Sequence, residues 1–121
     1  MKTITRLFSW QDNAFLDLWS IVHILWGGIL GFVAIHKKWS FYPSLVIATI
    51  LIIFWEYIEY VWGINESWTN ILSDIVLGIT GFITGYKLPT KMKVDPYIFL
   101  IPTFLIVVVL EYIGWINYLS R

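Results

Sequence analysis

The chain has 121 residues, of which 59% are hydrophobic and 13% are charged, and its mean hydropathy is +0.75. Globular domains carry roughly 25% charged residues, so this composition excludes both a small soluble domain and a disordered chain. Eight basic and eight acidic residues give a formal net charge of zero, which argues against a nucleic-acid partner. The absence of cysteine excludes disulfides and thiol chemistry. The composition therefore predicts a single integral membrane domain over residues 1–121.

Apolar stretches separated by short polar segments predict four transmembrane helices. Residues 1–12 come first, where Lys2 and Arg6 alternate with large apolar side chains, and they predict a short helix in the membrane interface. Each later stretch has roughly 20 residues, enough to cross about 30 Å of hydrocarbon at 1.5 Å per residue. Short connections predict an all-α, antiparallel up-down four-helix bundle. The predicted spans are 14–35, 41–62, 68–86 and 96–118.

The connections and the small residues refine this scheme. Residues 87–95 predict a link between the third and fourth spans, with Asp95 as an N-cap and Pro96 at the first helical position. Glycines recur on the first and third spans and predict close contact between helices. These glycines are Gly27, Gly28, Gly31, Gly78, Gly81 and Gly85.

The distribution of basic residues predicts an orientation. Five lysines lie in the first and third loops, whereas Lys2, Arg6 and Arg121 lie on the other side. Because cytoplasmic loops carry an excess of Lys and Arg, both termini are expected outside the cytoplasm. The end of the bundle that carries these loops is called the lysine end below. Its five lysines are Lys37, Lys38, Lys87, Lys91 and Lys93.

Ionisable residues inside the predicted spans point to a site, because charged side chains in a membrane are costly and usually face a bundle interior. Each span contributes one such group at roughly 9–14 Å from the end opposite the lysines, called the acidic end below. These groups are His23, Glu56, Asp74 and Glu111. Glu59 and Asn70 lie about one turn nearer the acidic end, on the same helix faces as Glu56 and Asp74.

Carboxylates crowded together in a low dielectric need protons or a cation to compensate them. One imidazole with several carboxylate oxygens suits Zn, Mn or Fe, so one divalent metal ion is a candidate cofactor. Its predicted ligands are His23, Glu56, Asp74 and Glu111. The alternative is a proton-sharing cluster that only holds the helices together.

Three short polar patterns carry a resemblance to known membrane proteins. His23 is followed by Gly27, Glu56 by Glu59 and an aromatic residue, and Asn70 by Asp74 with a glycine seven residues further on. This order resembles YjdF-like small inner-membrane proteins and, more loosely, the VanZ-like family. The match covers residues 21–85, and Asn70 stands where the YjdF-like pattern has an aspartate. The resemblance implies an inner-membrane location and a shared polar site.

The sequence favours an enzyme that acts on a lipid or lipid-linked substrate in one leaflet. Glu56, Asp74 and His23 are the predicted catalytic groups, working by general acid–base chemistry, while Glu59 and Asn70 would orient them. A proton- or cation-coupled carrier and an accessory subunit with a structural polar cluster are the alternatives. The nearly all-apolar stretches 46–51 and 104–109 argue against a continuous polar pathway. Membrane lipids are the expected partners, and the sequence is also compatible with an oligomer.

Overall fold

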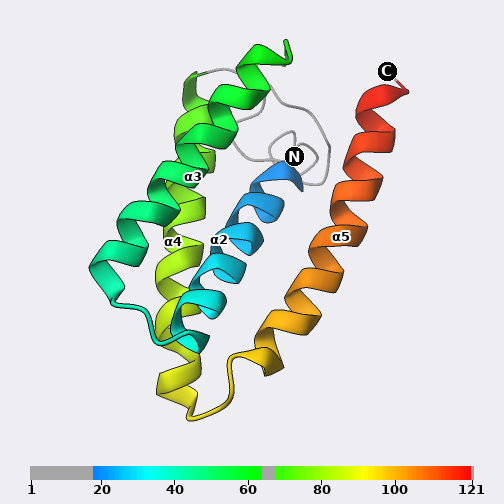
Figure 1. The fold of residues 1–121 in the computed structure, drawn as a ribbon. Coiled ribbons are helices and arrows are strands. Elements are labelled where there is room, and N and C mark those ends of the chain that lie inside the picture. The colour runs from blue at the N-terminus through cyan, green and yellow to red at the C-terminus, as the bar shows by residue number, and fades with distance from the viewer. Residues whose placement is uncertain (1–17, 64–67, 121) are drawn as a thin grey trace.

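The computed structural model describes residues 18–63 and 68–120, so the predicted interfacial helix at 1–12 lies outside the described residues. Within them the chain forms four long α-helices and no strand, as the hydropathy pattern predicts. Consecutive helices run in opposite directions, and α2 begins at the same end of the molecule at which α5 ends (Figure 1). The helices are α2 Leu18–His36, α3 Phe41–Val61, α4 Trp68–Met92 and α5 Tyr97–Leu119.

All four helices are long and apolar enough to cross a membrane. Large hydrophobic side chains cover the outward faces of α3 and α5, among them Ile50 and Leu105. Water would solvate such a surface poorly, whereas lipid chains are as apolar as the side chains themselves. Helix length and composition thus indicate a membrane protein with four spans, each satisfying its own backbone hydrogen bonds.

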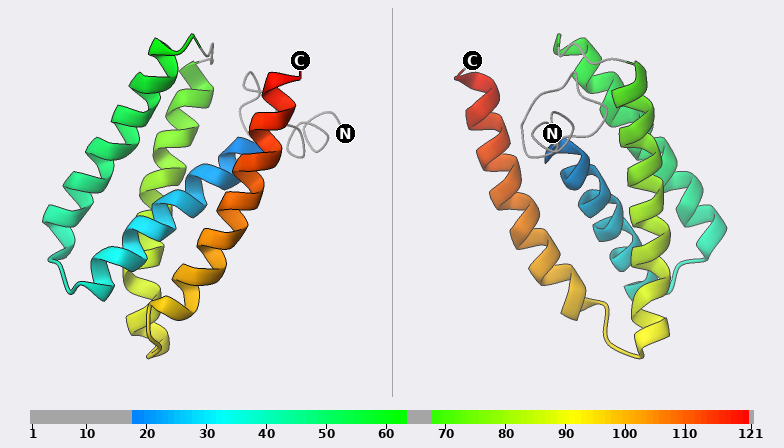
Figure 2. Two further views of the ribbon diagram at one scale, coloured as in Figure 1. Left: turned by 45° about the vertical axis from the view of Figure 1, so that its right-hand side comes forward. Right: turned by 180° about the vertical axis from the view of Figure 1, so that it is seen from behind.

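The four helices are not arranged as a square. α2 and α4 form a central pair and run in the same direction, while α3 packs mainly on α4, and α5 packs on α2. Two further views place α3 and α5 on opposite sides of this pair (Figure 2). In a square up-down bundle the first and third helices would lie on a diagonal. Here they make the most extensive contact in the described part of the chain.

Glycines allow α2 and α4 to meet through their backbones, which confirms the close contact predicted from sequence. A Cβ added at Gly27 would overlap the carbonyl oxygen of Gly78, and one at Gly81 would overlap that of Ile24. Gly85 is enclosed by backbone atoms in the same way. Because any larger side chain would push the helices apart, these glycines fix both the separation and the register of α2 and α4.

The predicted end of the third span is wrong, because α4 continues past Tyr86 to Met92. The prediction treated Pro89 and the polar residues around it as a link. Pro89 instead lies inside the helix and is fully buried. Proline removes one backbone hydrogen bond, a loss that membrane helices accommodate when neighbouring groups pack around it. Burial here outweighs the local tendency of proline to end a helix.

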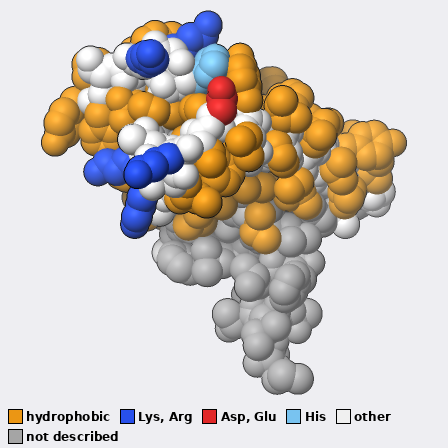
Figure 3. Space-filling model, turned by 90° about the horizontal axis from the view of Figure 1, so that it is seen from below, with side chains coloured by type: hydrophobic (Ala, Val, Ile, Leu, Met, Phe, Trp, Pro, Cys, Tyr) orange, Lys and Arg blue, Asp and Glu red, His pale blue; other side chains and the backbone are white. Residues whose placement is uncertain are grey.

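At the lysine end, α2 and α4 terminate in the same way. In α2 the Trp39 N–H donates to the carbonyl oxygen of Ala34 at 2.9 Å, and the corresponding bond after α4 is 3.0 Å long. In both cases the preceding residue, Lys38 or Lys93, has a φ of 58°. This is the Schellman ending, usually made by glycine, and it places a cation beside the negative end of each helix dipole. Figure 3 shows the lysines of the described residues in two groups on this end.

The start of α5 confirms the cap predicted from sequence. The Asp95 carboxylate accepts a hydrogen bond from the backbone N–H of Tyr97 at 2.9 Å. Pro96, between them, already has helical dihedral angles, with φ −55° and ψ −27°. Asp95 therefore caps the helix, and Pro96 takes the first helical position, where its missing N–H costs nothing.

Candidate active site

A paired histidine and aspartate lie where α2 and α4 pack together. His23 and Asp74 each precede by one turn the glycines at which the two backbones touch, Gly27 and Gly78. The parallel helices therefore carry the two side chains to the same level, and His23 Nε2 lies 3.1 Å from Asp74 Oδ2. The imidazole is 11% exposed and the Asp74 side chain 1%. The glycine contact thus sets the position of a buried histidine–aspartate pair.

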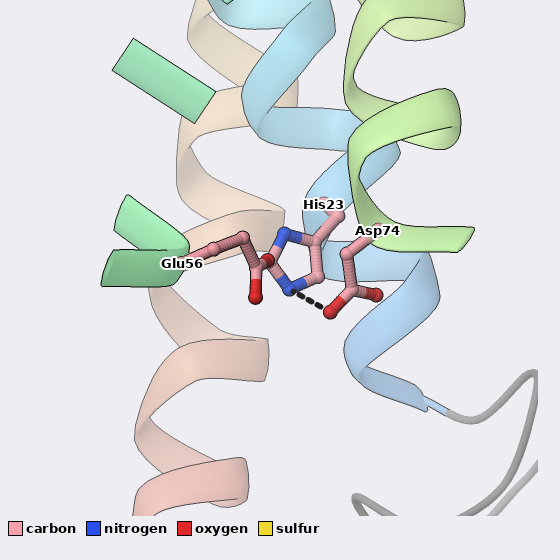
Figure 4. Close-up of side chains that lie close together, drawn as sticks. All are labelled: His23, Glu56 and Asp74. Carbon is pink, nitrogen blue, oxygen red and sulfur yellow. Dashed lines mark ion pairs between the residues drawn. The ribbon is translucent and has the colours of Figure 1, made fainter. Parts of the chain in front are cut away.

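Glu56 brings α3 to the same point. Its carboxylate, one imidazole nitrogen of His23 and one oxygen of Asp74 all lie within 4.8 Å of one another. Figure 4 shows the two carboxylates on either side of the imidazole. Glu56 is itself only 9% exposed, although α3 as a whole is mostly exposed. Three helices therefore deliver three of the four predicted ligands to one place.

The fourth predicted ligand, Glu111, is held differently. Its Oε1 accepts a hydrogen bond from the indole N–H of Trp26, and its Oε2 accepts one from Trp115, both at 2.9 Å. Among the described residues the group of converging ligand atoms consists of His23, Glu56 and Asp74, without Glu111. The depth of Glu111 follows from sequence arithmetic, but its orientation is set by tryptophans on two helices.

The two predicted orienting residues are both buried. Asn70 is 2% exposed and lies on α4 one turn from Asp74, while Glu59 is 9% exposed and lies on α3 one turn from Glu56. The sequence places them towards the acidic end, and the structure adds that they are enclosed in the fold. Buried polar groups in this position can restrict how their neighbours move.

A cavity of about 310 Å³ opens beside His23. Its walls come mainly from α2 and α3, with one residue each from α4 and α5. Most of them are apolar or aromatic, as in ligand pockets generally. The lining residues are Trp19, Val22, His23, Trp26, Leu30, Leu51, Ile52, Trp55, Glu59, Gly78 and Glu111.

Sequence reasoning did not find the tryptophans of this cavity. Trp26 and Glu111 are 85 residues apart, so no local pattern connects them. Trp115 lies four residues from Glu111, a spacing at which helical side chains meet, and this signal was available. The structure also places Trp55 in the cavity wall.

Charge is distributed unevenly along the molecule. The described residues near the site include four carboxylates and one imidazole, whereas every described lysine lies at the opposite end. In addition, Asp74 Oδ1 is buried without a hydrogen-bond partner among the described residues. Buried carboxylates in this arrangement need protons or a cation. The four carboxylates are Glu56, Glu59, Asp74 and Glu111.

The arrangement supports two kinds of chemistry. A carboxylate at Asp74 accepts a hydrogen bond from His23 Nε2–H, which leaves Nδ1 as the basic nitrogen of the neutral imidazole. Alternatively, one imidazole and two carboxylates form a three-ligand set of the type found in catalytic metal sites, which keep a further position open. Both assign the central role to His23.

No family model, curated protein or solved structure matches this chain.

Proposed function

We propose that the protein is a membrane-embedded enzyme acting on a lipid or lipid-linked substrate. The observation that carries this proposal is the position of His23, which is paired with buried Asp74 on one side and lines a largely apolar cavity on the other. A substrate group in the cavity would meet a histidine already oriented by a carboxylate, while lipid chains would suit the surrounding helix faces.

Each residue has a distinct role in this proposal. Asp74 fixes the tautomer and orientation of His23, which acts as the general base. Glu56, on the far side of the imidazole, takes up or returns the proton. Glu59 and Asn70 hold their neighbours in place. The apolar walls exclude water, which strengthens every electrostatic interaction in the site.

A divalent metal ion fits the same three residues, because Asp74 offers a buried oxygen without a partner in the described chain. When bound, it would act as a Lewis acid that polarises a substrate oxygen. Metal analysis of detergent-purified protein tests this form of the proposal. About one Zn, Mn or Fe per chain, absent from His23→Ala, would assign the metal-dependent form. Metal-free protein with full activity would assign simple acid–base catalysis.

The main test is a lipid-turnover assay in liposomes of mixed phospholipids, followed by mass spectrometry of every lipid class. Wild-type protein is expected to convert one class with time. Asp74→Asn and Glu56→Gln should abolish the conversion, since they preserve side-chain shape but remove the acid–base groups. Tyr57→Phe, on the exposed side of α3, is the matched control and should retain it. Turnover by Asp74→Asn at the wild-type rate, or conversion of no lipid, would refute the proposal.

A cation- or proton-coupled carrier is the second candidate, because another cavity of about 530 Å³ lies towards the lysine end. Leu30 and Leu51 line both cavities, so the region that they share is apolar. Such a region opposes ion passage, which favours the enzyme. Proton or cation flux into liposomes that depends on Asp74 would reverse this preference.

The proposal includes the orientation and the location. The proposed location is the plasma (inner) membrane, in agreement with the resemblance to YjdF-like proteins. The lysine end would face the cytoplasm, in agreement with the positive-inside rule. A reporter that works only outside the cytoplasm should then be active when it is fused after Arg121. A reporter active only in the cytoplasm would move the site to the inner leaflet.

A further inference from the structure

The cavity beside His23 combines aromatic side chains with carboxylates. Three tryptophans line it, Trp19, Trp26 and Trp55, together with Glu59 and Glu111. Indole faces attract cations through their quadrupole, and this effect is largest for tryptophan among the aromatic residues. Carboxylates in the same wall add a full negative charge. Aromatic walls with acidic groups are the recognised means by which proteins bind substituted ammonium ions.

The position of Glu111 strengthens this argument. Trp26 and Trp115 donate one hydrogen bond to each of its two oxygens, so the carboxylate is held in place at the cavity wall. Each carboxylate oxygen can accept a further hydrogen bond. Glu111 is therefore a carboxyl group of fixed orientation with accepting capacity left for a ligand. Its role differs from that of the His23, Glu56 and Asp74 group.

The carboxylates in the cavity wall favour one class of headgroup. Among the described residues, the cavity wall contains Glu59 and Glu111 but no lysine or arginine. A phosphate would face Glu59 and Glu111 and be repelled. An ammonium group would instead be attracted by both carboxylates, and this attraction is stronger in a low dielectric than in water. The volume of about 310 Å³ is at the lower end of small-ligand pockets, roughly 300–1,000 Å³.

We infer that this cavity binds a substituted ammonium group, so that the substrate class is an amine- or choline-bearing lipid. The inference rests on the proposed function and names the substrate for it. The lipid chains would extend along the apolar helix faces, and the ammonium would lie between the tryptophans and the two glutamates. The adjacent His23 would then face the part of the headgroup next to the ammonium.

The test is lipid binding to detergent-purified full-length protein, measured by native mass spectrometry. The probes are phosphatidylcholine, phosphatidylethanolamine and phosphatidylglycerol with identical acyl chains. The two ammonium lipids are expected to bind at least about tenfold more tightly than phosphatidylglycerol. A tenfold difference in affinity is the effect expected from one favourable pair of opposite charges. Equal binding of all three, or a preference for phosphatidylglycerol, would overturn the inference.

Matched variants assign the preference to the cavity. Glu59→Gln should remove most of the tenfold preference, whereas Asp95→Asn, the same change at the lysine end, should leave it intact. Trp55→Phe should weaken ammonium binding about threefold, since phenylalanine is the weaker cation–π partner, and Trp39→Phe should have no effect. A preference that survives in Glu59→Gln would overturn the inference. Unchanged helical circular dichroism in each variant confirms folding.

A competition arm separates the two sources of an ammonium group. Tetramethylammonium chloride that displaces phosphatidylcholine shows that the headgroup alone is recognised, so free amines are ligands too. Failure to displace it shows that the lipid chains are required. The failure of the inference is also distinct from failure of the proposed function. Lipid turnover without ammonium preference refutes only the inference, whereas a preference that depends on Glu59, without turnover, refutes only the enzyme.

Discussion

The two halves of the α2–α4 pair enclose side chains of opposite kinds. Towards the lysine end the pair encloses an apolar cluster that includes Ala34 and Phe82, with Ala48 from α3. Towards the acidic end it encloses Asp74, His23 and Asn70. Apolar packing alone would serve both halves, since buried ion pairs rarely stabilise a protein more than apolar side chains of similar volume. Burying charged side chains in the acidic half therefore costs free energy of folding, and a purely structural role does not explain this cost.

The aromatic side chains show the same contrast. At the lysine end, Phe41, Phe82 and Tyr86 pack ring against ring, and the Lys87 ammonium lies 5.1 Å from the centre of the Phe41 ring. At the acidic end, tryptophans instead hold Glu111 and line a cavity. Aromatic residues thus pack around an apolar cluster in one half, whereas in the other half they hold a carboxylate at a cavity wall.

Breaking the His23–Asp74 pair should give the largest loss of stability. His23→Ala leaves an uncompensated buried carboxylate and is expected to destabilise the protein by about 3–5 kcal/mol. The double variant His23→Ala/Asp74→Ala should be clearly less unstable than the sum of the single variants, because it removes both charges. Unfolding in a denaturant series measures all of these variants. Additive effects would show that the two side chains do not interact.

Disturbing the glycine contact should have the next largest effect, and it should affect both halves. Gly81→Leu drives a side chain into the α2 backbone at Ile24, at an expected cost of about 1–3 kcal/mol or more. The control is Gly28→Ala, since a Cβ there would lie 3.8 Å from its nearest neighbour, an ordinary contact. Thermal unfolding in detergent distinguishes the two. Equal melting temperatures would show that Gly81 faces lipid.

Removing one donor to Glu111 should have a smaller effect, confined to the acidic half. Trp26→Phe keeps the ring but loses the hydrogen bond to Oε1, at an expected cost of about 1 kcal/mol. The matched control is Trp39→Phe at the lysine end. The loss of stability, measured by denaturant unfolding in detergent, provides the readout. A variant indistinguishable from the control would contradict the observed hydrogen bond.

The smallest effect should be a gain of stability at the lysine end. Lys38→Gly relieves the left-handed conformation at a φ of 58° and is expected to stabilise the protein by about 0.5–1 kcal/mol. Lys37→Gly, one residue earlier and followed by the same loop, is the control and should destabilise the helix end instead. Urea titration measures both. A loss of stability in Lys38→Gly would show that its charge matters more than its backbone.

The depth of the site could be predicted from sequence because membrane thickness and helix rise are fixed quantities. His23 and Asp74 were placed at one level by counting residues from the helix ends, and the structure brings them to 3.1 Å. The sequence pattern determines the rotation of each helix about its axis less well than its depth. The orientation of Glu111 towards Trp26 could therefore not be predicted. The central pairing of α2 with α4 depends on which glycines face each other. Pro89 is buried by tertiary packing, which the local sequence pattern does not predict.

The 25 residues of α4 span about 37 Å. A bilayer with a hydrocarbon core of about 30 Å is too thin for this helix, which must tilt or extend into the headgroups. Because glycine contacts join α2 and α4, a change in bilayer thickness would tilt them together. His23 and Asp74 would keep their separation while their depth changed. Hydrophobic mismatch would thus move the site relative to the lipid headgroups without deforming it, and lipids of different chain length would meet it at different depths.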